Sequence, residues 1–165
     1  METPVLDRQI LMSLVHYDPE TGLLTWKTAR KKCRVGDAVG NLDSKGYLRC
    51  MLLGVEYRVH RLIWFYMTGE WPPVEIDHKN RVRTDNRWNN LRLATAGEQR
   101  QNQGIRSDSE TGFRGVGYLP AKNKWLARIA INNTRKSLGW HDTIIDAVAA
   151  RLRAERALYT HSPIH

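Results

Sequence analysis

The segment VEIDHKN, residues 74–80, places the carboxylate of Asp77 directly before the imidazole of His78. A carboxylate is a hard oxygen ligand suited to Mg²⁺, which prefers to share its coordination shell with waters and a substrate phosphate. An imidazole whose pKa is near neutrality can take a proton from an attacking water. Because successive side chains of a strand point to opposite faces, the two groups are expected to take different roles. The pair could hydrolyse a phosphodiester, although taken alone such a pair in a basic loop is more often a solvated turn.

Amide side chains follow this pair in the next 25 residues of the chain. Gln99 and Asn102 lie three positions apart, on one face of a predicted helix, and either amide oxygen could complete a metal site opposite Asp77. Three asparagines in between could pin the loop and orient His78 through hydrogen bonds. These residues are Asn86, Asn89 and Asn90.

Two strands and a helix are predicted to position these groups. VEID reads as a strand, residues 79–90 read as a polar loop, and NLRLA reads as a second strand. Thr95 and Glu98 then have the capping-box spacing that begins a helix. The expected order is therefore strand, loop, strand and helix.

The chain before this segment predicts a helix, several hairpins and a second helix. Apolar residues at three- and four-residue spacing predict a short amphipathic helix, and they are Leu6, Ile10, Leu14 and Tyr17. Short antiparallel strands with turns between them follow, and residues 60–69 then change to a helical period that ends at Gly69. His60 begins this second helix, where it could position the helix from the core, face DNA or face the active site.

Composition restricts the classes of partner. Lys and Arg number 26 against 17 Asp and Glu, and the net charge of +9 predicts an anionic partner. The chain of 165 residues could form one domain or two to three small ones. No apolar run is long enough to span a bilayer and no secretion signal is evident, so a cytoplasmic protein is expected. Cys33 and Cys50 lack the spacing of a zinc site and are predicted to be free thiols.

The run IDHKNRVRTDNRWNNLRLAT, residues 76–95, resembles the HNH homing-type endonucleases of phages and prophages. The signature of that family stands here as Asp77-His78, Asp85-Asn86 and Asn90-Leu91-Arg92. The upstream stretches HYDPETGLLTWK, GYLRC and HRLIWFYMTGEWPP also resemble the N-terminal part of such proteins. The resemblance therefore covers most of the chain.

This resemblance implies a ββα-metal (His-Me finger) nuclease core. It places Asp77 on a single Mg²⁺ or Mn²⁺ ion, His78 as the general base for water, and Asn90 as the residue that holds the base and its loop. The ion would stabilise the departing 3′ oxygen and leave a 5′ phosphate. Such enzymes commonly carry Asn or His as the second protein ligand in the final helix, where Gln99 stands here, and Asn102 is the other candidate. A phage- or prophage-encoded protein in a bacterial host is the expected source.

The last third of the chain has its own pattern. Residues 102–112 read as a linker, residues 113–141 alternate like three strands, and Thr143 caps a helix that continues through Leu158. One apolar stripe of that helix is predicted to cover one face of the sheet, and its residues are Ile145, Val148, Ala149 and Leu152. Basic residues are predicted to gather on the uncovered face, namely Arg114, Lys122, Lys124, Arg128, Arg135 and Lys136.

This portion resembles the plant ethylene-response-factor (APETALA/ERF) type DNA-binding domain, whose sheet reads the major groove. The resemblance rests on FRGV at 113–116, KWLARI at 124–129, LG at 138–139 and DT at 142–143. Carried over by position, the DNA-facing residues are Arg114, Tyr118, Trp125, Arg128 and Lys136. The family commonly has Glu where Arg128 stands and Trp where Ser137 stands, so DNA binding is expected without a transferable sequence preference.

Together these patterns predict an α+β chain in three parts. Residues 1–58 form an N-terminal helix and hairpin region, residues 59–104 the nuclease core, and residues 105–165 the linker and DNA-binding domain. The predicted function is a metal-dependent HNH endonuclease that nicks or cleaves double-stranded DNA, either as a monomer or as a homodimer. The alternatives are a catalytically inactive DNA-binding regulator and a protein that binds structured RNA.

Overall fold

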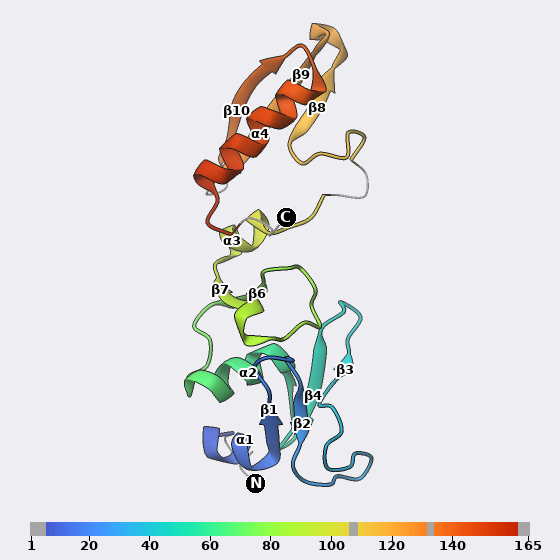
Figure 1. Ribbon diagram of the computed structural model, residues 1–165, viewed down its shortest axis with the longest axis vertical. Helices are drawn as coiled ribbons and strands as arrows, with labels where there is room; N and C mark the ends of the chain where they lie inside the picture. Colours follow the sequence, from blue (N-terminus) through green and yellow to red (C-terminus); the bar gives the residue numbers. More distant parts are fainter. Residues whose placement is uncertain (1–5, 106–108, 132–133, 162–165) are drawn as a thin grey trace. The chain divides into compact units, whose positions relative to one another are not determined.

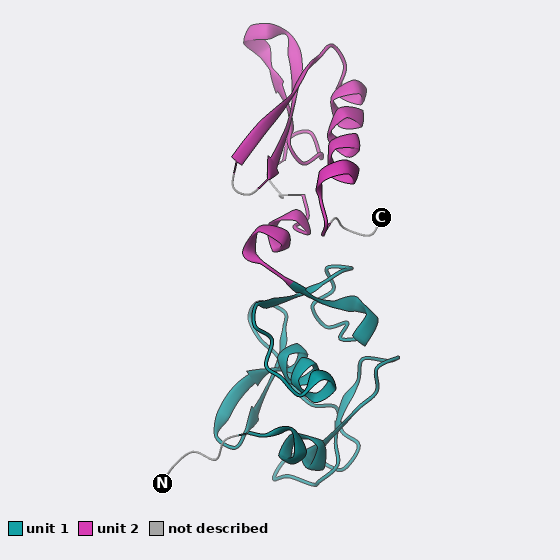
Figure 2. Cartoon of the chain, turned by 90° about the vertical axis from the view of Figure 1, so that its left-hand side faces the viewer, with its two compact units in different colours: residues 1–93 teal, residues 94–165 magenta. Residues whose placement is uncertain are grey.

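The computed structural model describes residues 6–105, 109–131 and 134–161 (Figure 1). The chain divides into two compact units, residues 1–93 and residues 94–165 (Figure 2). Both units mix helices with small antiparallel sheets, as expected for an α+β chain. Within the described residues, every helix is too short or too polar to cross a membrane.

The first unit contains two helices, a 3-10 helix and three small sheets. In chain order its elements are α1 (Arg8–Leu14), β1 (Val15–Tyr17), β2 (Leu24–Trp26), β3 (Asn41–Leu42), β4 (Leu48–Leu52), β5 (Val55–Arg58), α2 (Val59–Thr68), β6 (Glu75–His78), the 3-10 helix η1 (Trp88–Asn90) and β7 (Leu91–Ala94). Strand β1 pairs with β2, β4 lies between β3 and β5, and β6 pairs with β7.

One apolar core holds this unit together. It joins residues that are far apart in the sequence, from Leu11 and Trp26 through Leu52 and Leu62 to Leu91. Residues 1–58 therefore share a core with α2 and β7. Cys33 and Cys50 are free cysteines, as the sequence predicted.

Helix α1 is shorter than its apolar spacing predicted. Asp7 caps its N-terminus by accepting a hydrogen bond from the backbone N–H of Ile10 at 2.7 Å. The helix ends at Leu14, and the chain changes to a strand in which Val15 and Tyr17 are buried. The expectation that Tyr17 is helical is thus wrong, because pairing with β2 places Tyr17 opposite Leu24 and buries both.

Helix α2 follows its sequence signals closely. It ends at Gly69, which adopts a left-handed φ of 82° and donates its backbone N–H to the carbonyl of Phe65. The face that contains Val59, Leu62 and Ile63 is buried in the core. This helix and strands β6 and β7 are the framework of the candidate site.

The second unit begins with a capped helix and ends with a longer one. Its elements are α3 (Ala96–Gln101), β8 (Val116–Leu119), the 3-10 helix η2 (Pro120–Lys122), β9 (Lys124–Ile131), β10 (Thr134–His141) and α4 (Ile144–Leu158). Thr95 and Glu98 form the predicted capping box of α3, and Thr143 caps α4 as predicted. The order β6, loop, β7, α3 is the predicted order of strand, loop, strand and helix.

The sheet of this unit has the order β10-β9-β8, and α4 packs across all three strands (Figure 1). Its small core consists of Val116, Ala127 and Ala147, with partly buried apolar side chains around them. The predicted apolar stripe of α4 is wrong in part, because Val148 packs against this core but Ile145 and Leu152 are exposed. Ile145 is 75% exposed, whereas Ala147 and Arg151 are buried. The small side chain of Ala147 allows close approach to the sheet, and this contact sets the rotation of the helix.

Candidate active site

Strand β6 presents Asp77 and His78 to opposite sides. His78 is 3% exposed, while Asp77 is partly exposed, as the alternation of side chains along a strand requires. The separate roles predicted for the two residues are therefore compatible with their geometry. The imidazole lies in the interior of the first unit, and the carboxylate lies at its surface.

His78 is held by the amide of Asn86. The His78 Nε2 and Asn86 Oδ1 atoms are 3.0 Å apart, and both side chains are buried. An amide oxygen only accepts hydrogen bonds, so Nε2 carries the hydrogen and the imidazole lone pair lies on Nδ1. Any transfer of a proton to His78 is thereby directed to Nδ1.

Tyr17 fixes Asn86 in turn. The Tyr17 hydroxyl donates to the backbone carbonyl of Asn86 at 2.7 Å, and this bond joins β1 to the loop across 69 residues of sequence. Burial raises the pKa of Tyr17, so its hydroxyl stays protonated and able to donate at neutral pH. The N-terminal region therefore supports the orientation of the candidate base.

Burial also lowers the pKa of His78 from its ordinary value, and the hydrogen bond that His78 donates to Asn86 and the charge of Asp77 oppose this shift in part. The imidazole is consequently neutral at pH 7. A neutral imidazole is the form that can accept a proton.

Two further rings pack around His78. The centroids of His60 and His78 are 5.3 Å apart in an edge-on arrangement, and Tyr47 contacts both rings. His60 is 2% exposed, and burial lowers its pKa to about 3. Arg58 and Arg83 each lie over the Tyr47 ring, at 4.8 and 5.1 Å. Of the three roles left open for His60, the structure shows a buried residue that packs against the candidate base.

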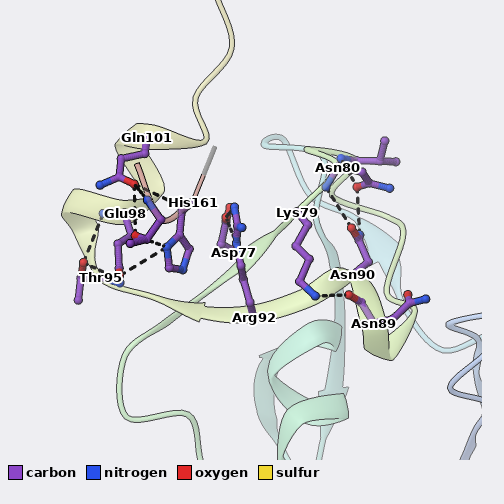
Figure 3. Close-up of polar contacts among 12 residues, drawn as sticks. Asp77, Lys79, Asn80, Asn89, Asn90, Arg92, Thr95, Glu98, Gln101 and His161 are labelled. Carbon is purple, nitrogen blue, oxygen red and sulfur yellow. Dashed lines mark hydrogen bonds and ion pairs between the residues drawn. The ribbon is translucent and has the colours of Figure 1, made fainter. Parts of the chain in front are cut away.

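Asn90 holds both ends of the loop between β6 and β7 (Figure 3). Its Oδ1 accepts the backbone N–H of Asn80 at 3.0 Å, and its Nδ2 donates to the side chain of Asn80 and the carbonyl of Asp85. The carbonyl of Asn90 accepts the backbone N–H of Lys79 at 2.9 Å. Asn90 thus ties down the loop that contains Asn86, and its role in positioning the base stays a prediction.

Asp77 is paired with Arg92 of β7 (Figure 3). The Nε and Nη2 atoms of Arg92 donate to Oδ2 of Asp77 at 3.0 and 2.8 Å. A cation bound at this carboxylate must share it with the guanidinium or displace the guanidinium. Arg92 was expected only as part of the family signature, and its pairing with Asp77 is a feature that the sequence did not reveal.

The donor types present suit a magnesium or manganese ion. Mg²⁺ is commonly bound through one or two carboxylates together with waters and substrate phosphates. Asp77 supplies such a carboxylate. Among the described residues, no group of three or more His, Cys, Asp or Glu side chains is arranged to hold a metal, and a magnesium site of this kind does not require one.

The two candidates for a second ligand lie in the second unit and differ in burial. Gln99 is partly exposed on α3, whereas Asn102 caps the C-terminus of that helix and is 3% exposed. A partly exposed amide is accessible to a metal ion, and a buried one is not. This difference favours Gln99, whose role as a ligand stays a prediction.

A glycine that the sequence did not single out supports the loop. Gly22 has a φ of 75°, and a Cβ placed on it would lie 2.4 Å from the backbone nitrogen of Arg87. Trp88 also donates its backbone N–H to the carbonyl of Pro19 at 3.0 Å. The turn before β2 therefore packs directly against the segment that contains Asn86. The glycine in DPETG was the only sequence signal of this contact.

The residues predicted to face DNA in the second unit do not share one face. Trp125 belongs to the apolar cluster beneath α4, and Tyr118 is its cross-strand partner, with ring centroids 5.1 Å apart. Arg128, three residues beyond Trp125, lies on the opposite face. The expectation of one common face is wrong because an odd separation along a strand reverses the side chain.

Arg114 and Lys136 also differ from the expected arrangement. The Arg114 guanidinium donates to the backbone carbonyls of Arg100, Gln101 and Gln103 and so closes the C-terminal end of α3. Lys136 lies opposite the buried Ile129 and therefore projects on the side that α4 covers. The basic residues that do lie on the uncovered face of the strands are Lys124, Arg128 and Arg135.

Comparison with known proteins identifies the class of the first site. Residues 57–101 match the family model described as HNH endonuclease. The matched segment includes α2, β6, the loop, β7 and α3, and it contains Asp77, His78 and Asn90. The chain thus carries an HNH endonuclease domain, which supports a nuclease enzyme.

A solved structure is also similar to the chain. It is titled "DNA binding and cleavage by the HNH homing endonuclease I-HmuI", with 19% sequence identity and a TM-score of 0.40. The similarity covers 74% of this chain and 70% of that chain. A search of the curated proteins found no match. The ERF-type domain and the phage origin stay predictions.

Proposed function

We propose that this protein is a metal-dependent HNH endonuclease that hydrolyses phosphodiester bonds in double-stranded DNA. The observation that carries the proposal is the HNH match over residues 57–101, the segment in which a buried, neutral imidazole is held in one tautomer. The excess of Lys and Arg, with a net charge of +9, supports a polyanionic substrate.

In this proposal His78 accepts a proton from the attacking water at Nδ1. Asn86 keeps the hydrogen on Nε2, so that the ring does not have to change tautomer before it can act. Asn90 keeps the loop in place, and the packing of His60 against His78 keeps water away from one side of the ring.

Asp77 would hold a divalent ion, with Gln99 as the proposed second ligand. When bound, such an ion neutralises charge that develops on the phosphate and stabilises the departing oxygen. Arg92 would then move from Asp77 or remain as a second contact of its carboxylate. In either case the guanidinium compensates the charge of the carboxylate before the ion arrives.

We further propose that the second unit delivers the nuclease to DNA through the uncovered face of its sheet. Arg128 is exposed there, and its side chain makes no hydrogen bond or ion pair with the described part of the chain. Lys124 lies on the same face and is paired with Asp142 at 2.8 Å. Exposed cations on a sheet can contact phosphates, and sheets can enter the major groove. Of the DNA-facing residues carried over from ERF-type domains, Arg128 lies on this face.

A plasmid assay tests the hydrolytic role. The full-length protein should nick supercoiled plasmid in Mg²⁺ or Mn²⁺ and should lose this activity in EDTA. His78→Ala should lower the rate by about 10²–10⁴-fold, the usual contribution of general base catalysis. His16→Ala is the matched control because His16 is exposed on β1. Equal rates for the two variants would reject His78 as the base.

A binding assay tests the delivery role separately. Arg128→Glu and Arg153→Glu change the net charge equally, but Arg153 is exposed on α4, outside the sheet. Arg128→Glu should weaken duplex binding in EDTA by about tenfold more than Arg153→Glu, because one lost phosphate contact is replaced by repulsion. Equal losses would refute a DNA-binding role for this face. Competition by a structured RNA hairpin measures the preference for DNA.

The ion pair between Asp77 and Arg92 favours one alternative, a catalytically inactive DNA-binding protein. In such a protein the guanidinium would take the place of the metal ion permanently. Binding of duplex DNA without nicking in any divalent metal would support this alternative.

A further inference from the structure

The second unit contains a cavity of about 470 Å³ that the proposed nuclease function does not use. Four arginines line it, namely Arg114, Arg128, Arg135 and Arg151. Ile105 and Phe113 provide apolar lining, and no carboxylate side chain is among the described residues of the wall. A concave site with cations on one part of its wall and an aromatic ring on another is typical of a small-ligand site.

The cavity forms where the sheet loses a strand. Strand β8 pairs with β9 only as far as Val116 and Ala127, so the edge of β9 beyond that point faces the segment that leads into β8. Gly115 lies at this junction with a φ of 73°, and a Cβ placed there would lie 2.9 Å from Nε of Arg151. The same Cβ would lie 2.3 Å from the backbone carbonyl oxygen of Arg128, so the close packing at this junction requires a glycine.

Arg151 is the unusual member of the wall because it is buried. It is 4% exposed, yet its Nε has no hydrogen-bond partner within the described chain. Its Nη1 is ion-paired with Glu155 at 2.8 Å without hydrogen-bond geometry, and its Nη2 lies 3.4 Å from the hydroxyl of Tyr159. Because its Nε and Nη1 atoms are both buried, Arg151 supports the wall from within the unit and is not one of the proposed ligand contacts.

The charges at the cavity do not balance. Glu155 compensates Arg151, and Arg114 is engaged by the carbonyl groups at the end of α3. Arg128 and Arg135 are exposed and form no ion pair within the residues described. Two uncompensated guanidinium groups on a concave wall give a positive potential, which favours an anion with several acceptor oxygens.

We propose that this cavity binds the phosphate group of a nucleotide. The guanidinium groups of Arg128 and Arg135, which lie on the same face of the sheet, contact the phosphate, and the base packs on Phe113, which is 44% exposed. The volume exceeds that of a phosphate alone and suits a mononucleotide. The nucleotide is either free or part of a DNA strand. The proposal goes beyond hydrolysis and does not depend on it.

Calorimetric titration of the full-length protein in EDTA tests the site without catalysis. The probes are deoxyadenosine monophosphate, deoxyadenosine and inorganic phosphate. The monophosphate should bind with one site per chain and at least about tenfold more tightly than deoxyadenosine, because the nucleoside lacks the charge-assisted contacts. It should also bind more tightly than inorganic phosphate, which lacks a base.

Two variants of matched charge test the location. Arg135→Glu places a carboxylate in the wall and should weaken binding of the monophosphate by at least about tenfold. Arg153→Glu makes the same change on the exposed side of α4, outside the cavity lining, and should leave the affinity unchanged. If melting shows that Arg135→Glu is unfolded, Arg135→Gln takes its place, with a loss of several-fold expected.

Competition by a short duplex and by a single strand identifies the source of the phosphate. If DNA displaces the monophosphate, and if Arg135→Glu weakens the binding of that DNA, the bound phosphate belongs to a DNA strand. Retention of the monophosphate in the presence of DNA assigns it to a free nucleotide. The proposal is overturned if no saturable binding occurs, if deoxyadenosine binds equally well, or if the Arg135 and Arg153 variants bind alike. None of these results depends on whether the protein nicks DNA.

Discussion

Replacement of Asn86 by aspartate would put a carboxylate where an amide oxygen now lies 3.0 Å from Nε2 of His78. Both side chains are buried, so little solvent would screen the new charge. A carboxylate at this distance favours the protonated, charged form of an imidazole and raises its pKa by about 1–3 units. At present burial holds the pKa of His78 below its ordinary value. The substitution therefore reverses the direction of the shift.

The sign of the effect on catalysis follows from the role of the base. A general base acts only when it is unprotonated, so the pH of half-maximal nicking by the wild type should lie below 6.5, and the rate should fall as the solution becomes more acidic. In Asn86→Asp the pH of half-maximal rate should rise by about 1–3 units, and full activity should return at higher pH. The measurement is the initial rate of plasmid nicking between about pH 5 and pH 9 at constant metal concentration.

Asn89→Asp is the matched control, because Asn89 is exposed in the same loop and adds the same charge. Its half-maximal pH should stay close to that of the wild type, since solvent and salt screen an exposed charge. Superimposable profiles for the two variants would refute the assignment of His78 as the base oriented by Asn86. Thermal melts of both proteins, together with Asn86→Ala, separate a change in titration from a loss of folding.

Three further predictions concern stability and the loop. Burial holds the pKa of His60 at about 3, so the free energy of unfolding should decline as pH falls below about 6.5, by up to about 1.4 kcal/mol per pH unit. His60→Phe should reduce this slope in urea unfolding and exposed His16→Gln should not; an unchanged slope in His60→Phe would contradict the assignment. Gly22→Ala and Gly54→Ala both place a side chain at positive φ, but only at Gly22 does the new Cβ meet backbone, 2.4 Å away. Gly22→Ala should therefore cost about 1–3 kcal/mol more than Gly54→Ala in the same assay, and equal losses would argue against the contact. Asn90→Ala should cost about 1–3 kcal/mol and speed tryptic cleavage in residues 79–89, because buried loop groups lose their partner; wild-type cleavage rates would show that other contacts hold the loop.

Local signals in the sequence predicted the local structure well. The capping box of Thr95 and Glu98, the Thr143 cap and the Gly69 terminus all involve residues within one or two turns of each other. Such contacts form wherever the chain is helical, whatever surrounds it. Helix boundaries in this protein were accordingly predictable at these three ends.

Which face of an element is buried was harder to predict. The apolar residues of α4 predicted contact through Ile145, but the helix packs through Ala147 and buries Arg151. Small side chains permit the closest approach of a helix to a sheet, so the hydrophobicity of the side chains alone does not predict which face of the helix packs. The resemblance to ERF-type domains placed Trp125 on the DNA-facing side of the sheet, whereas Trp125 packs beneath the helix.

By itself, the sequence determined the chemical groups of the candidate site, namely an adjacent acid and imidazole on opposite sides of a strand and an asparagine that closes the loop. Alternation along a strand and short-range hydrogen bonds fix these relations within a few residues. Only the tertiary structure decided which nitrogen of His78 can accept a proton, because that depends on the hydrogen bond with Asn86. Asn86 is itself held by a hydrogen bond from Tyr17, which lies 69 residues away in the sequence. The tertiary structure also decided that four arginines converge on one cavity. Contacts of this kind arise from the packing of distant segments, and no local pattern encodes them.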